Sequence, residues 1–86
     1  YGLLGSTVKD GEKTNTQTAG SITLAQGDKS NTSTAEKEVL TAKDDQGNTV
    51  ENTQTAKGND LVKKSNNGKE LASNKQTAEN ITLSKD

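Results

Sequence analysis

The sequence predicts an all-β protein of short strands in imperfect repeats of about 16 to 22 residues, arranged as a β-solenoid or sandwich and assembling with copies of itself. Three observations predict it: a polar pentapeptide that occurs four times, a glycine a few residues before each copy, and a leucine five residues after the alanine of each copy. The repeats span about residues 11–26, 27–46, 47–67 and 68–86, and residues 1–10 are expected to be an N-terminal docking segment.

The pentapeptide reads NTQTA at residues 15–19 and 52–56, NTSTA at 31–35 and NKQTA at 74–78. In an extended backbone its second and fourth residues share one face, and its first, third and fifth share the other. Threonine favours strands, and stacked asparagines can form ladders between equivalent strands or chains. The predicted core and ladder residues are therefore Asn15, Ala19, Leu24, Asn31, Ala35, Leu40, Asn52, Ala56, Leu61, Asn74, Ala78 and Leu83.

Each glycine before a pentapeptide is expected to form a turn, because glycine adopts positive φ without steric cost. The expected turn centres are the dipeptides Asp10-Gly11, Gln26-Gly27, Gln46-Gly47 and Asn67-Gly68. Short apolar stretches such as SITLA and NITLS lie between these turns. Two strands per repeat give eight or nine strands in all.

A helix is the competing interpretation of residues 33–47. Ser33 and Glu36 have the spacing of a helix capping box, and Gly47 would end the helix. The first and third copies carry glycine and β-branched residues at the matching positions. Equivalent copies should share one backbone conformation, so the strand is preferred.

The chain is poor in apolar residues. Only 13 of its 86 residues are Leu, Val or Ile, a fraction below the roughly 20% typical of disordered chains, and there is no Cys to form disulfides. A compact monomer with its own core is therefore poorly supported. A disordered chain and a chain ordered by self-association are both open, and self-association is the leading expectation.

Several classes of function are excluded by composition. The chain has no His or Cys, so catalytic triads and ordinary transition-metal sites are not expected. Its 11 lysines and 12 acidic residues are interspersed and give a net charge of −1, which does not favour nucleic-acid binding. No apolar run is long enough to span a membrane. Asp44 and Asp45 are expected in a solvated turn, not in a glycosidase or calcium site. We expect no enzyme activity, cofactor or metal.

The Thr-x-Thr pairs Thr16/Thr18, Thr32/Thr34 and Thr53/Thr55 resemble those of ice-binding β-helices of the antifreeze class. That resemblance implies a flat threonine face that binds ice, although Lys75 replaces the first threonine of the fourth copy. The polar repeats are also similar in physical strategy to curli-like functional amyloids, but the defining spacing of those repeats is not matched.

The leading functional expectation is a structural subunit of an extracellular fibre, pilus or surface layer, as in biofilms, assembling by strand stacking or strand addition. The most apolar segment, YGLLGSTV, is the candidate assembly segment, with Tyr1, Leu3, Leu4 and Val8 as its apolar residues. The alternative is a binding module, either a repeat segment of a surface adhesin or antigen or an ice-binding solenoid.

A start at Tyr1, without Met, suggests a processed or excised chain; a removed signal peptide would fit, and so would an engineered fragment. The expected location is extracellular or at the cell surface. Asn31 and Asn80 lie in Asn-x-Ser/Thr sequons and would be possible glycosylation sites if the protein is secreted.

Overall fold

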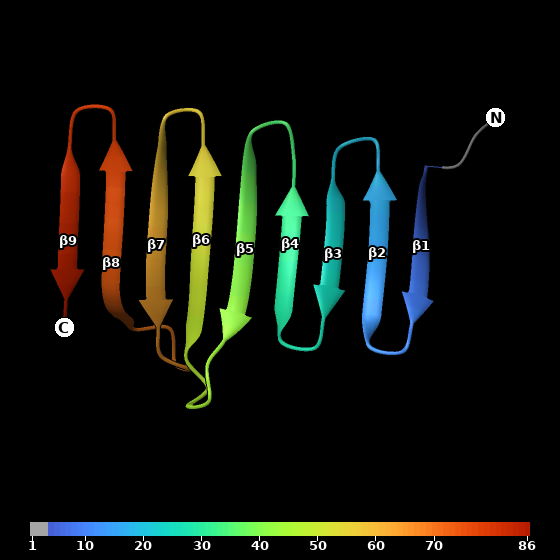
Figure 1. Cartoon of the computed structure of the whole chain (residues 1–86), viewed down its shortest axis with the longest axis horizontal. Coiled ribbons are helices and arrows are strands. Elements are labelled where there is room, and N and C mark those ends of the chain that lie inside the picture. Colours follow the sequence, from blue (N-terminus) through green and yellow to red (C-terminus); the bar gives the residue numbers. More distant parts are fainter. Residues whose placement is uncertain (1–3) are drawn as a thin grey trace.

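The computed structural model describes residues 4–86, which form nine strands. They are β1 (Gly5–Asp10), β2 (Lys13–Thr18), β3 (Ile22–Gln26), β4 (Lys29–Ser33), β5 (Lys37–Lys43), β6 (Thr49–Thr55), β7 (Gly58–Lys64), β8 (Glu70–Thr77) and β9 (Ile81–Lys85). The strands lie side by side in sequence order and every neighbouring pair is antiparallel (Figure 1). The predicted all-β class is confirmed.

The sheet is a single open layer. Its principal extents are 49 × 33 × 16 Å. The radius of gyration is 15.3 Å, against about 12 Å for a compact domain of this length. Strands β1 and β9 are its two edges and lie at opposite ends of the sheet (Figure 1). Among the described residues no hydrophobic side chain is buried, and the one buried residue is Ser73.

The expected solenoid or sandwich arrangement is not confirmed. Each connection between described strands is a short hairpin, so the chain advances by one strand at a time along a single sheet. A solenoid needs parallel pairing between successive coils, and a sandwich needs connections that cross to a second layer. Self-assembly stays a prediction.

Four turns at one end of the sheet have threonine as their first residue. The hydroxyl oxygens of Thr18, Thr34, Thr55 and Thr77 each accept hydrogen bonds from the backbone N–H groups two and three residues later, at 3.1–3.3 Å. This arrangement is a Ser/Thr turn, in which the side chain satisfies N–H groups that the ladder leaves free. Each of these threonines is the fourth residue of a pentapeptide, so the repeated peptide includes the start of a turn.

The same turn explains why residues 33–47 do not form the competing helix. The Thr34 hydroxyl accepts from the N–H groups of Glu36 and Lys37 in a hairpin turn, and the chain then continues as β5. Ser33, the expected helix cap, instead donates a hydrogen bond to Glu38 Oε1 at 3.1 Å. The residues that have the spacing of a helix capping box, Ser33 and Glu36, thus lie at the end of β4 and in the hairpin turn that joins β4 to β5.

Glycine turns join the strands at the other end of the sheet. Gly11 and Gly27 have φ values of 62° and 55°, and each is the first residue of a two-residue connection. The turn centres are thus one residue later than the sequence predicted. No other described residue type has positive φ, so these connections place glycine where a type II′ turn requires it.

The two longer connections, residues 44–48 and 65–69, follow a common pattern. In each, the glycine N–H donates to the carbonyl oxygen of the first loop residue: Gly47 to Asp44 at 3.2 Å, and Gly68 to Ser65 at 2.9 Å. Side chains at the same first position, Asp44 and Ser65, accept hydrogen bonds from backbone N–H groups further along the loop.

The threonine turns should contribute measurably to stability. We expect Thr55→Val, which keeps the shape but removes the hydroxyl, to lower the free energy of unfolding by about 1 kcal/mol. Thr55→Ser retains the acceptor and should lie within about 0.5 kcal/mol of the parent protein. Urea unfolding measures both effects, and amide hydrogen exchange at Lys57 and Gly58 should accelerate only in the valine variant. Equal destabilisation by the two substitutions would contradict this role of the hydroxyl.

Candidate functional site

One row of side chains crosses the whole sheet and alternates between leucine and asparagine after its first residue. Directly opposed residues in antiparallel strands point to the same face. Neighbouring members of the row are paired in each of the eight strand pairs, so they share one face, which we call the leucine face. The row is Val8, Asn15, Leu24, Asn31, Leu40, Asn52, Leu61, Asn74 and Leu83.

The spacing within each repeat follows from the threonine turn. The two residues that follow Thr18 form the connection, so Thr18 lies opposite Ser21. Three positions further from the turn, on the same two strands, Asn15 lies opposite Leu24. The same geometry applies to the other three pentapeptides. The offset of five residues from alanine to leucine is therefore the register of a hairpin.

A β-bulge maintains this register where the repeat length changes. Leu40 to Asn52 is twelve residues, and the equivalent Leu61 to Asn74 is thirteen. The extra residue is taken up by an irregularity between Lys63 and Lys64, so Leu61 still pairs with Asn74. Without the bulge, Asn74 and Leu83 would point to the opposite face.

Exposed apolar side chains are concentrated on the leucine face. Leu24, Leu40 and Leu61 are 51%, 43% and 44% exposed, so in a single sheet the predicted core leucines are only half covered. All the large hydrophobic strand residues classed as exposed belong to this face: Val8, Ile22, Leu24, Leu40, Leu61, Ile81 and Leu83. Ile22 and Ile81 were not among the predicted core residues, although their period-two spacing from Leu24 and Leu83 could have identified them.

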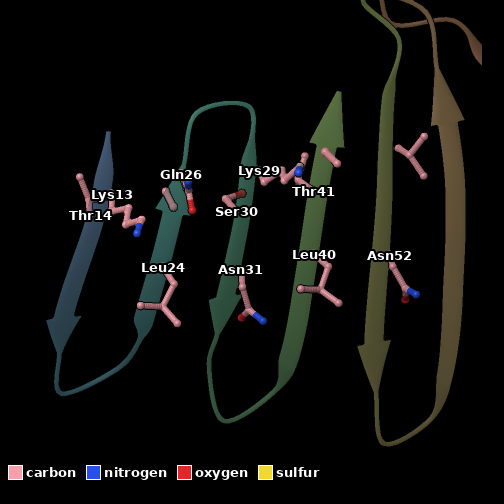
Figure 2. Close-up of a pocket in the computed structure, with 13 residues that line it drawn as sticks. Lys13, Thr14, Leu24, Gln26, Lys29, Ser30, Asn31, Leu40, Thr41 and Asn52 are labelled. Atoms are coloured by element: carbon pink, nitrogen blue, oxygen red, sulfur yellow. The ribbon is translucent and has the colours of Figure 1, made fainter. Parts of the chain in front are cut away.

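The centre of this face is hollowed. Figure 2 shows Leu24, Asn31, Leu40 and Asn52 extending in a line from four neighbouring strands, β3 to β6. The hollow beside them has a volume of about 580 Å³, and Ala42 and Val50 are among its lining residues. It is open to solvent and wide enough to take apolar side chains from another surface.

The asparagines of the row differ in their hydrogen bonds. Asn31 Oδ1 lies 3.2 Å from the Ser33 hydroxyl, whose single proton it shares with Glu38 Oε1. Asn74 Oδ1 accepts from the Gln76 amide at 3.1 Å. Asn52 Oδ1 is covered but has no hydrogen-bond partner in the described structure. A covered, unpaired carbonyl oxygen costs about 1–3 kcal/mol, a cost that rotation of the Asn52 amide toward a donor would remove.

The other predicted residues lie in different places. Ala19, Ala35, Ala56 and Ala78 are exposed residues of the threonine turns, away from the row. Of the candidate assembly segment, Tyr1 and Leu3 lie outside the described residues, and Leu4 is 93% exposed. Residues 5–10 form β1, which is paired with β2 along its full length.

The two sequons are in different environments. Asn80 is an exposed residue of the last threonine turn, whereas Asn31 is half-buried in the row between Leu24 and Leu40. A glycan on Asn31 would cover the centre of the leucine face. Asn80 is therefore the more accessible of the two positions.

The opposite face is rich in threonine, and we call it the threonine face. Thr7, Thr16, Thr23 and Thr32 are directly opposed neighbours on β1 to β4, and the hydroxyls of Thr23 and Thr32 are 3.4 Å apart. The row continues through Val39, Thr53, Asp60, Lys75 and Thr82. The regular part of the threonine row thus covers β1 to β4.

Titratable groups do not cluster into a recognisable reactive site. No group of three or more acidic side chains within residues 4–86 is placed to hold a metal ion. The described chain also contains no helix that could cross a membrane.

Among the described residues, Asp44 is the one whose pKa is clearly shifted. Desolvation acts to raise its pKa, but hydrogen bonds from the backbone N–H groups of Asn48 and Gln46 outweigh it and hold the pKa below its ordinary value. The Asn48 amide and the Lys63 ammonium, 3.6 Å from Oδ2, act in the same direction. These contacts make Asp44 a structural residue of its turn.

Comparison with protein-family models, with curated proteins and with solved structures finds no match to this chain.

The Asp44 turn should make stability depend on pH in the acid range. Because the folded pKa lies below the unfolded value, the carboxylate stabilises the fold above that value, and the contribution is lost as pH falls through the folded pKa. We expect the urea midpoint to fall as the pH drops below about 4, and Asp44→Asn to flatten this fall. Asp45→Asn, at an exposed neighbour, is the control and should keep the parent profile. Identical profiles for the two variants would contradict the prediction.

Proposed function

We propose that the protein is a structural subunit of an extracellular fibre, pilus or surface layer, and that it assembles through the open edges of its sheet. The observation that carries this proposal is a nine-stranded sheet with two free edges and no buried hydrophobic side chain in the described chain. Unpaired edges are templates for another strand, and joining unlike edges gives an open polymer.

The β9 edge supports strand addition in detail. Thr77 N–H donates to Asn80 O at 2.9 Å, and Asp86 N–H donates to Leu71 O at 2.8 Å. The direction of the backbone hydrogen-bonding groups alternates along a strand. The backbone N–H and C=O groups of the even-numbered residues of β9 therefore point toward β8, and the N–H groups of Ile81, Leu83 and Lys85 point toward the open edge. An incoming β1 strand would extend the existing ladder there.

The extracellular location remains part of the proposal. A chain without Cys, His or aromatic residues beyond Tyr1 offers little reactive chemistry, and its cohesion would come from the backbone ladder. Lysine and acidic side chains dispersed over the sheet keep such an assembly hydrated.

Blocking the β9 edge should stop polymerisation. Leu83→Pro removes an N–H that faces the open edge, and edge positions tolerate proline because no internal ladder bond is lost. Leu83→Ala is the matched control, since it removes the same side chain and keeps the N–H. At micromolar concentrations we expect polymers from the parent and the alanine variant by negative-stain imaging, and discrete particles from the proline variant. Monomers from all three proteins, or equal assembly by all three, would exclude edge addition.

Ice binding is the second candidate function, and the row formed by Thr7, Thr16, Thr23 and Thr32 favours it. These residues repeat at the strand spacing of about 4.8 Å, which is a regular array of hydroxyl and methyl groups.

Ice crystals grown in the presence of the protein test this candidate. A shaped crystal habit that is lost in Thr16→Lys and kept in Gln17→Lys, on the other face, would support it. Unshaped crystals at millimolar protein would exclude it.

A further inference from the structure

We propose that the leucine face binds the leucine face of a second copy of the chain, so that two single sheets pack into a two-layer unit. The inference builds on the proposed self-assembly, but it concerns a face of the sheet, whereas the proposed polymerisation uses its edges. It explains what covers the apolar side chains that a lone sheet leaves half exposed.

The size of the face suits a second copy. Nine strands at about 4.8 Å spacing and strands of about six residues give a face of roughly 40 × 20 Å, or about 800 Å². Stable protein interfaces bury about 800 Å² on each partner. Two such faces would pack about 10 Å apart, the usual separation of sheets in a sandwich.

The row is complementary to itself. A two-fold axis parallel to the row places each strand over the same strand of the second copy, so that leucine lies over leucine and asparagine over asparagine. Two facing asparagine amides can donate to each other's carbonyl oxygens. Asn52 Oδ1 is covered within the sheet, so its amide would rotate to face the second copy and take there the donor that it lacks.

The charges beside the row favour this orientation because it keeps the two lysine-bearing sides apart. On the side of the glycine turns the leucine face carries one acidic residue, Asp10, and four lysines, Lys13, Lys29, Lys63 and Lys85. The opposite side of the row has no lysine in its strand positions and contains Glu38. An axis parallel to the row lays the lysine side of one copy over the Glu38 side of the other. An axis parallel to the strands would instead bring the two lysine sides together, each with four lysines and one aspartate, although Lys85 of β9 would then lie over Asp10 of β1.

The hollow fits the same arrangement. It lies on the lysine side of the row, where Ala42 and Val50 are short and Lys13 and Lys29 form part of its lining. The row-parallel axis brings the Ile22 side of the second copy toward it. Apolar side chains of the second copy would fill the space that the short residues leave.

A charge scan of the two faces tests the proposal. Leu40→Lys places a cation at the centre of the leucine face, and Leu40 is exposed enough for a single sheet to tolerate the change. Thr53→Lys places the same charge on the threonine face of the neighbouring strand. The test uses an edge-blocked Lys9→Pro background, because the Lys9 N–H faces the open β1 edge and its side chain lies on the threonine face. Sedimentation equilibrium of this background should give dimers, with the dissociation constant raised at least about 100-fold by Leu40→Lys and less than about 3-fold by Thr53→Lys.

Cysteine cross-linking tests the orientation, because the chain has no Cys of its own. With the axis parallel to the row, Leu24→Cys should form homodimers linked by a short bismaleimide reagent, because a direct disulfide is too short for sheets about 10 Å apart. With the axis parallel to the strands, Leu24 would lie over Leu61 of the second copy, and only mixtures of Leu24→Cys and Leu61→Cys proteins would cross-link.

The outcomes separate the two proposals. Dimers of the edge-blocked protein that dissociate with Leu40→Lys support face pairing even if the parent protein forms no fibres. Monomers of the edge-blocked protein up to millimolar concentration, or equal effects of Leu40→Lys and Thr53→Lys, overturn face pairing even if the parent polymerises. Cross-linking of Leu24→Cys only with Leu61→Cys overturns the row-parallel axis.

Discussion

The structure depends on the register set by four hairpins that begin at a threonine. In each, the threonine hydroxyl holds the next backbone N–H groups, and the two-residue connection places an asparagine opposite a leucine three ladder positions away. Side chains alternate between faces along a strand, so a slip of one residue would move every leucine to the other face. The fold is therefore specified by its turns more than by a core.

A single sheet with no buried hydrophobic side chain in residues 4–86 is an unusual arrangement for a chain of this size. The backbone ladder satisfies the polar groups within the sheet, but the leucine face remains half exposed and the edges remain unpaired. The two proposals address these two features separately: edge addition extends the ladder, and face pairing covers the leucines. Together they would build a two-layer ribbon from a chain that has only 13 large aliphatic residues.

The all-β class and the role of the glycines could be predicted because both depend on short stretches of sequence. Strand-forming residues and a turn-forming glycine recur with each pentapeptide. The position of the turn could not be predicted, since Asp10-Gly11 fits a type I′ centre as well as Gly11-Glu12 fits the connection that forms. The sequence also suggested a solenoid or sandwich, because leucines at equivalent positions suit any layered fold. The bulge at Lys63 and Lys64 and the unpaired Asn52 oxygen depend on the assembled sheet and had no sequence signal.

Cross-strand nuclear Overhauser contacts in a dilute solution of the protein test the central claim most directly. The account predicts one continuous series of contacts between neighbouring strands from Val8 to Leu83, including Leu61 with Asn74 across the bulge. It also predicts no contact between β1 and β9. A one-residue shift at any asparagine–leucine pair, or contacts that join β1 to β9 within one molecule, would contradict the open sheet held in register by its turns.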